Sequence, residues 1–265
     1  MWQLRVAILV LGLVSWSSAG AEVSPLNLSP GFPTQLDDAY PINKGNVVVQ
    51  PAFRFDKVES QEVRVRQTVD VRWGVVSGLE VFAGGTTAWG PLHPGTVDDP
   101  RGVRVGLLYR FNKQQEGDLA LPSLGIRVTG QVPVTGPWSE PSARAEMLAS
   151  WDLGPQWWGH WWAHANVGFQ VTPEVRPGLQ SVGQRSIWYG RAGLVRAFTS
   201  ELGGVASVTY GQDPTQAGAY VWTPEVGLMW AIRPEWILTT GAGHDFGSSP
   251  LKSTFRGNMA ITWVW

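Results

Sequence analysis

Histidine and serine are the residues of this chain with the clearest capacity for catalysis or metal binding. The histidines are His93, His160, His164 and His244. His160 and His164 fall on one face of an alternating segment, ~13 Å apart if that segment is a strand, which is too far for one metal ion to bridge. A Ser–His nucleophile would require Ser150, on the preceding segment, beside one of them. Hydrogen bonding in a wet interior is the alternative role for both histidines.

Other motifs for catalysis and cofactor binding are missing from the sequence. It contains no HExxH, no GxSxG and no glycine-rich phosphate loop between a strand and a helix. With no cysteine, disulfides and thiolate metal sites are excluded. His244 and Asp245 are neighbours in sequence, so in a strand they point to opposite faces and cannot form a relay. We therefore predict no catalytic residue, no metal and no cofactor, and a protein that is not an enzyme.

Composition narrows the class of protein further. The 20 Lys and Arg against 21 Asp and Glu give a formal net charge of −1, which offers nothing for nucleic acid. The chain is rich in tryptophan and glycine, with 16 and 32 residues. Tryptophan suits the boundary between lipid and water. After residue 21 no apolar run approaches the ~20 residues of a transmembrane helix, so the composition favours a membrane barrel over a soluble sandwich.

The first residues predict export. Arg5 precedes an apolar run from Val6 to Val14, and Ala19-Gly-Ala21 is a small-x-small cleavage signal. This layout is that of a secretory signal peptide over residues 1–21, used by the general secretory pathway, with an uncleaved anchor as the alternative. We expect residues 22–45 to form a periplasmic N-terminal segment or a short plug in the lumen. Residues 46–265 form the predicted transmembrane domain.

Alternation of apolar and polar residues predicts the fold. Val63, Val65, Val69, Val71 and Trp73 share one face of a strand whose other face is charged, and only a water-filled lumen accommodates such a face. Similar segments recur along the chain and predict an all-β, antiparallel, up-and-down transmembrane barrel of about twelve strands. They are 46–56, 62–73, 78–89, 101–112, 122–134, 142–153, 157–171, 186–198, 202–212, 221–232, 236–246 and 254–265.

The connections predict how this barrel is oriented. Links after even-numbered segments are mostly short, and links after odd-numbered segments include 90–100 and 172–185. Outer-membrane barrels have short periplasmic turns and long external loops, so both termini are expected in the periplasm. The link 113–121 is long for a periplasmic turn. Whether 90–100 and 172–185 cover the external mouth stays open. The predicted location is the outer membrane, with its lipids as partners.

The final segment carries the most specific pattern. Met259, Ile261, Trp263 and Trp265 alternate along it. This arrangement resembles the C-terminal signal read by the barrel-assembly machinery, which we predict as a partner. The same strand is expected to pair with the strand that begins near Asn46, because closure leaves no edge exposed to lipid.

The inward face of the predicted strands collects charge, mostly arginine. We expect Arg72 and Glu80 to pair across a short turn. An excess of arginine on one wall would favour anions in a pore, whereas a salt-bridged lumen would only stiffen the barrel. The predicted pore-lining residues are Arg54, Arg64, Arg66, Asp70, Arg72, Glu80, Arg104, Arg110, Arg127, Arg144, Glu146, His160 and His164.

Three stretches resemble a known family. They are Pro33–Ala39 followed by Gly45, then Gly78–Phe82, then Leu124–Gly136 with its Pro-x-Thr-Gly end. Over roughly residues 30–170 the chain is similar to the meta-pathway phenol-degradation-like outer-membrane transporters, a family that includes the barrel exporting functional amyloid subunits. The resemblance implies about twelve strands and a transport or channel role. The long helical extension of the amyloid exporter has no counterpart here, which argues against amyloid export.

Three functions remain open from the sequence. The first is an outer-membrane, porin-like channel or transporter for small solutes, including anionic or aromatic compounds. The second is a barrel enzyme that acts on lipids, which would need a reactive Ser–His pair. The third is a structural or adhesive barrel with an occluded lumen. The solute, the direction of transport and the oligomeric state are not encoded in any pattern that we recognise.

Overall fold

The computed structural model describes most of the chain from residue 32 onwards. The predicted signal peptide (1–21), loop residues 91–100 and 172–185, His93 and the Pro-x-Thr-Gly at 133–136 lie outside the described residues. The described residues are 28, 32–58, 62–90, 102–115, 119–132, 141–156, 159–171, 186–213, 218–249 and 252–265.

These residues are almost entirely β. Among them, no helix is long and apolar enough to cross a membrane. The strands are β1 (Val47–Val58), β2 (Val63–Val76), β3 (Leu79–Trp89), β4 (Gly102–Arg110), β5 (Ser123–Val132), β6 (Ser142–Gln156), β7 (Gly159–Val171), β8 (Ser186–Ala197), β9 (Leu202–Gln212), β10 (Tyr220–Arg233), β11 (Trp236–Gly243), the two-residue β12 (Phe246–Gly247) and β13 (Ser253–Val264).

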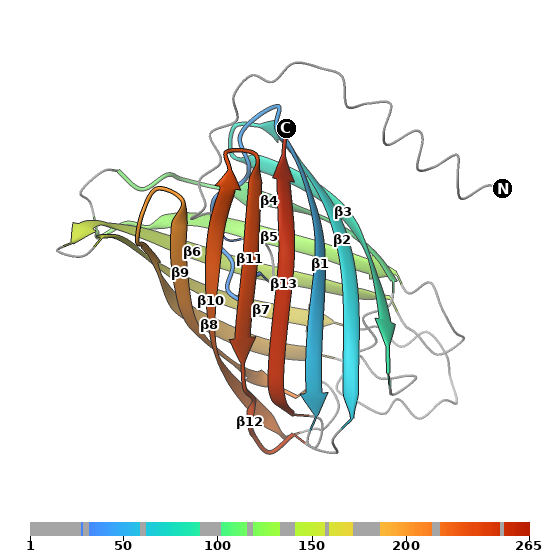
Figure 1. Cartoon of the computed structure of the whole chain (residues 1–265). Helices are drawn as coiled ribbons and strands as arrows, with labels where there is room; N and C mark the ends of the chain where they lie inside the picture. Colours follow the sequence, from blue (N-terminus) through green and yellow to red (C-terminus); the bar gives the residue numbers. More distant parts are fainter. Residues whose placement is uncertain are drawn as a thin grey trace.

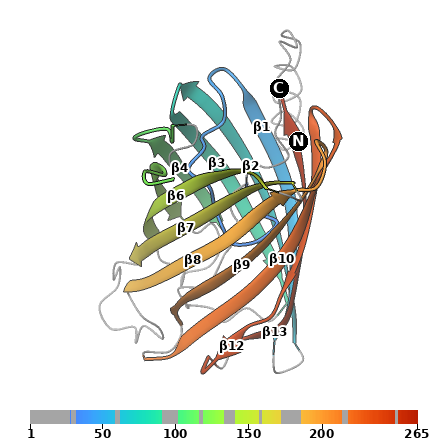
Figure 2. The same ribbon diagram turned by 90° about the vertical axis from the view of Figure 1, so that its left-hand side faces the viewer.

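The sheet closes on itself. Each long strand pairs antiparallel with its neighbours in sequence, and β13 pairs with β1 to complete the ring (Figures 1 and 2). Val48 lies opposite Val264, and Trp265 and Val47 exchange backbone hydrogen bonds. The predictions of a twelve-stranded antiparallel barrel and of its closing pair are confirmed.

One predicted strand was too long. The segment 236–246 keeps its pairing with β13 only as far as Gly243, and Phe246 then pairs with Trp222 of β10 as part of β12. Between them Asp245 turns inward, where its carboxylate accepts hydrogen bonds from Thr223 Oγ1 and Ser253 N. These bonds satisfy a buried carboxylate and interrupt the ladder.

The outer surface is apolar, as alternation requires. Val105, Val167 and Val226 are more than half exposed, whereas inward Asp70 and Arg72 are buried. Exposed aromatic rings flank this belt at both ends, where a bilayer has its interfaces. They include Trp73, Phe111, Trp230 and Trp236 at one end and Phe55, Trp89, Trp188, Tyr210 and Trp222 at the other.

The two ends of the barrel are distinguished by the chain termini. The terminal end is the one where β1 begins and β13 finishes, and the distal end is the opposite one. At the terminal end, Ser77–Gly78 and residues 234–235 make two-residue links. The long link after β4 is anchored there by Asn112, which donates from Nδ2 to the Pro122 carbonyl and accepts from Leu124 N.

Candidate functional site

The lumen is not empty at the terminal end. Residues 32–46, here called the luminal segment, run inside the barrel before β1 begins (Figure 1). Apolar side chains of this segment, together with Leu28 before it, pack against apolar positions of the inner wall in three places. Leu28 and Leu36 meet Val195, Val205 and Met229; Phe32 meets Ala52 and Ala260; Ala39 meets Leu108 and Leu148.

Asp37 fixes the middle of the luminal segment through both its backbone and its carboxylate. Its N–H donates to Asn166 Oδ1 at 3.1 Å, and its carbonyl accepts from Asn166 Nδ2 at 2.9 Å. Its carboxylate lies 2.8 Å from Arg127 Nη1 and 3.4 Å from Arg191 Nη1. All of these groups are buried, so the wall and the segment satisfy charges that neither could leave unpaired.

The wall also accepts hydrogen bonds from the segment's irregular backbone. Gln35 N donates to Glu225 at 2.8 Å, Ala39 N to Ser150 Oγ at 2.9 Å and Ile42 N to Glu80 at 3.1 Å. Buried backbone outside a sheet must find such partners, since an unpaired N–H is costly. The acceptors come from strands far apart in sequence, which pins the segment along its length.

Glycines in the wall allow the segment to approach closely. A Cβ on Gly241 would lie 2.0 Å from the Pro33 carbonyl oxygen, and one on Gly74 would lie 2.1 Å from the Asn43 carbonyl oxygen. A Cβ on Gly227 would meet the Pro33 ring at 2.6 Å. Any larger residue at these positions would displace the segment.

One carboxyl group of the luminal segment is perturbed by its surroundings. Burial raises the pKa of Asp38 to about 7, although N–H bonds from Tyr40 and Leu28 and the nearby Arg72 and Arg127 lower it. This carboxyl group therefore changes its protonation near neutral pH while the segment is docked.

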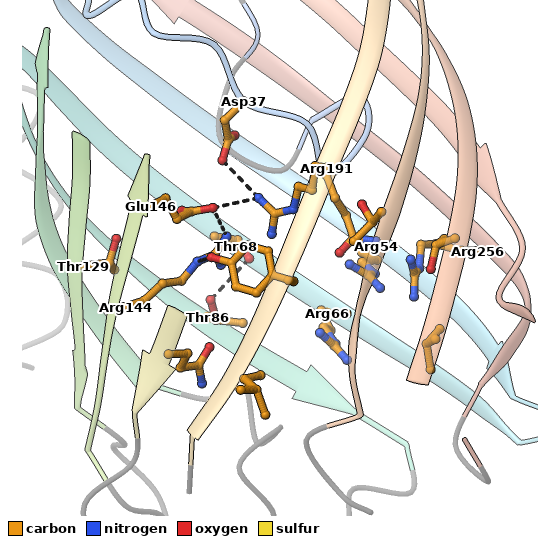
Figure 3. Close-up of a pocket in the computed structure, with 18 of the residues that line it drawn as sticks. Asp37, Arg54, Arg66, Thr68, Thr86, Thr129, Arg144, Glu146, Arg191 and Arg256 are labelled. Atoms are coloured by element: carbon orange, nitrogen blue, oxygen red, sulfur yellow. Dashed lines mark hydrogen bonds and ion pairs between the residues drawn. The ribbon is translucent and has the colours of Figure 1, made fainter. Parts of the chain in front are cut away.

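Beyond the segment, towards the distal end, the lumen holds a cavity of about 440 Å³ (Figure 3). Phe32, Gln35 and Asp37 of the luminal segment contribute to its lining. The described lining residues include nine arginines and Lys252 against six carboxylates. Two of these arginines, Arg72 and Arg256, also contact Glu80 and Glu225 outside the lining, which leaves a smaller positive excess. Such a cavity attracts anions and repels cations.

Ion pairs neutralise part of this charge. On one wall Arg104 pairs with Asp70. Glu146 receives Arg144 at 2.6 Å and Arg191 at 2.9 Å, and the guanidinium of each lies over the Tyr189 ring. Figure 3 shows Asp37, Arg191 and Glu146 joined in this way.

A second group of ion pairs centres on Asp56 of β1. Its carboxylate lies 3.0 Å from Arg54, 3.1 Å from Arg256 and 3.8 Å from Arg66. Arg256 also reaches Glu225 at 3.4 Å and Asp245 at 3.0 Å.

The structure places the predicted pore-lining residues in two groups. Four lie outside the lining of the cavity: Glu80, Arg110, His160 and His164. Glu80 is buried and bound bidentately by Arg72 with both contacts at 2.8 Å, which confirms the predicted pair. His160 contacts Asp152 and stacks on Trp162. The nine that line the cavity are Arg54, Arg64, Arg66, Asp70, Arg72, Arg104, Arg127, Arg144 and Glu146.

Sequence reasoning missed several residues of this site. Arg191 and Tyr189 belong to β8, whose weak alternation hides which face is inward. Arg256 and Asp56 could have been predicted, because each continues the two-residue period of its strand on the inward face. Asp37 lies in an irregular segment, where periodicity gives no signal.

Comparison with known proteins places this fold. No protein-family model matches the chain, and no curated protein matches its sequence. The NanC porin superposes with a TM-score of 0.56 at 10% identity, covering 82% of this chain and 98% of that chain. The KdgM porin gives 0.52 at 11% identity, covering 81% and 98%. The fold is that of a porin-like outer-membrane β-barrel.

The barrel brings together the Ser–His pair considered from the sequence. Ser150 Oγ lies 2.8 Å from His164 Nδ1, and both residues are buried. The same Oγ accepts the Ala39 N–H, and His164 Nε2 has no hydrogen-bond partner, so no third group orients the ring. The pair is covered by the luminal segment, which makes it part of the docking surface.

A metal site is not formed by the described residues. None of their His, Asp or Glu side chains assemble in groups of three or more that could hold an ion.

Proposed function

We propose that this protein is an outer-membrane channel for small acidic solutes, held closed by its luminal segment. The observation that carries the proposal is the cavity in the distal half of the lumen, whose described lining has nine arginines and Lys252 against six carboxylates. Anions are lowered in energy by such a field, and cations are raised. The segment fills the lumen on the terminal side, so passage requires its release.

The surroundings of the barrel follow from this proposal. The terminal end faces the periplasm, the distal end faces outwards, and the protein reaches the membrane through the secretory pathway and the barrel-assembly machinery. Membership of the meta-pathway phenol-degradation-like transporters is part of the proposal and rests on residues 33–39, 78–82 and 124–136. The structure of the KdgM porin in complex with disordered oligogalacturonate, an acidic sugar chain, is consistent with passage of acids through this kind of barrel.

A structural barrel with a permanently occluded lumen is the second candidate. The observation that favours it is the number of separate anchors on the luminal segment, from Phe32 to Ile42. The lipid-enzyme hypothesis has less support, because the Ser150–His164 pair lies beneath the luminal segment and lacks a third group.

Planar-bilayer recording distinguishes the two candidates. The full chain and a variant lacking residues 22–44 are reconstituted, and the reversal potential is measured in a KCl gradient. We expect the full chain to conduct rarely and the deletion variant to conduct steadily with anion selectivity. Cation selectivity would overturn the acidic-solute proposal. A deletion variant that folds and conducts nothing would favour the structural barrel.

A further inference from the structure

One wall of the cavity concentrates arginine beyond what its carboxylates can pair. Three adjacent strands, β13, β1 and β2, present two rows of inward side chains there. The register sets Arg256, Asp56 and Arg64 side by side in one row, and Asn258, Arg54 and Arg66 in the next. These six residues are called the arginine patch.

The patch contains four guanidinium groups and one carboxylate. Arg54 and Arg66 lie directly opposite each other, an arrangement that is unfavourable for like charges on neighbouring strands. Asp56 is already contacted by Arg54, Arg66 and Arg256. Asp56 makes no ion pair with the fourth arginine.

Arg64 is that fourth arginine. It is only 6% exposed, and its Nε and Nη2 atoms have no hydrogen-bond partner. No ion pair joins it to any described residue, although its register partner is Asp56. Leaving these two buried nitrogens without a partner is costly, since they have lost water and gained no hydrogen bond in return. It also lines the cavity, so a solute can reach it.

The floor beneath the patch is apolar. The next row of the same strands is Ala260, Ala52 and Thr68, and Phe32 of the luminal segment packs on the two alanines. A solute bound to the patch would therefore meet charge on one side and an aromatic ring on the other. A cavity of about 440 Å³ accommodates a molecule of monosaccharide size.

We propose that the arginine patch is an oxyanion-binding site and that Arg64 is its central donor, taking the carboxylate or phosphate group of a small solute. Planar guanidinium groups bind both groups through paired N–H donors. The inference rests on the proposed function for the class of solute. It adds a specific binding site to that function, whereas weak anion selectivity would need only the positive field of the cavity.

Binding to the purified full-length barrel in detergent micelles tests the site. The probes share one scaffold: galacturonate carries a carboxylate, galactose 1-phosphate a phosphate, and galactose neither. We expect the two anions to bind and galactose not to bind. Arg64→Gln should weaken binding of the anions by about tenfold or more, as expected for a lost charge-assisted pair of hydrogen bonds. Arg64→Lys should fall between, because the charge remains and the planar fork is lost.

Two controls separate the site from the field of the cavity. Arg104→Gln removes the same charge from the same cavity, but from a guanidinium engaged by Asp70, and Arg233→Gln removes an exposed charge outside it. Arg233→Gln should leave binding unchanged, and Arg104→Gln should lose clearly less than Arg64→Gln. Equal losses for Arg64→Gln and Arg104→Gln, or equal binding of galactose and galacturonate, would overturn the proposal.

Stability of the empty barrel gives an independent readout. If Arg64 serves only to hold the wall together, Arg64→Gln lowers the urea midpoint of unfolding. If Arg64 instead serves to bind a solute, the midpoint of Arg64→Gln equals or exceeds that of the wild type, and galacturonate raises the midpoint of the wild type alone. A lowered midpoint would contradict the proposal. The binding and unfolding assays require no passage of solute through the barrel. A barrel that does not conduct in bilayers would therefore contradict only the channel proposal, and a conducting barrel that binds neither anion would contradict only the proposed site.

Discussion

The two halves of the lumen are lined by the same strands and differ in what meets their charged side chains. Where the luminal segment docks, at the terminal edge of the cavity, Asp37 meets Arg127 and Arg191, and Glu80 meets Arg72 and the Ile42 N–H. In the distal half, several arginines share few carboxylates and Arg64 has none.

This difference teaches how one wall serves two purposes. Where the luminal segment and the wall supply groups of opposite charge, these groups pair with each other and hold the segment in place. Where the chain supplies no carboxylate, the arginines remain able to bind a solute.

Release of the luminal segment can be measured by thiol labelling, because the protein has no cysteine. A Thr34→Cys substitution puts a single thiol on a fully buried position of the segment, and its rate of maleimide labelling reports release.

Breaking the charge pairing in the terminal half should have the largest effect. Asp37→Ala leaves Arg127 and Arg191 without this carboxylate, and breaking a buried pair typically costs ~3–5 kcal/mol. We expect thiol labelling in the Thr34→Cys background to rise more than about tenfold. Gln35→Ala is the matched control, since its contact with Glu225 uses the backbone N–H that alanine keeps. Equal labelling of the two variants would show that Asp37 does not anchor the segment.

Steric displacement tests docking without changing any charge. Gly241→Ala places a methyl group 2.0 Å from the Pro33 carbonyl oxygen, so the segment must shift or leave. We expect labelling to rise severalfold, with smaller gains than for Asp37→Ala. Gly130→Ala lies on the same barrel with nothing within 4 Å of the added atom, and should label as slowly as the parent. A rise for Gly130→Ala of similar size would attribute the effect to strand stability.

Acidity should modulate docking through Asp38. Its pKa is raised to about 7 when docked, from 3.8 for a free aspartate, so the docked state holds a proton that the released state gives up. Docking is therefore tightest below pH 4 and weakens as pH rises to about 7, then levels off. Labelling, corrected for thiol reactivity, should follow this window, and Asp38→Asn should flatten it. A profile that is unchanged in Asp38→Asn would assign the dependence to other groups.

The smallest expected effect concerns the buried Ser–His pair. Ser150→Ala deprives the Ala39 N–H of its acceptor, which costs ~1 kcal/mol and raises labelling a few-fold. Hydrolysis of a p-nitrophenyl ester should be at background for both wild type and Ser150→Ala. An esterase activity of the wild type that disappears in Ser150→Ala would revive the enzyme hypothesis.

The sequence predicted the wall better than the contents of the lumen. Alternation is a property of neighbouring residues, so Val63 to Trp73 identified both faces of β2 without any knowledge of its partners. Arg72 and Glu80 were paired correctly because a tight turn fixes their relative depth. The break in β11 escaped prediction, since it depends on hydrogen bonds that the Asp245 carboxylate accepts from Thr223 Oγ1 and Ser253 N.

The sequence by itself determined the class of fold, the twelve strands and the inward and outward faces of those that alternate clearly, because period and turn length are local. It also determined the closing pair of β1 and β13, because a barrel in lipid leaves no edge unpaired. Only the tertiary structure decided where charge is satisfied. Arg256 reaches Asp56 from 200 residues away, and Asp37 reaches Arg191 from 154. Closure of the barrel fixes such meetings, and it leaves Arg64 as the buried cation whose partner the described chain does not supply.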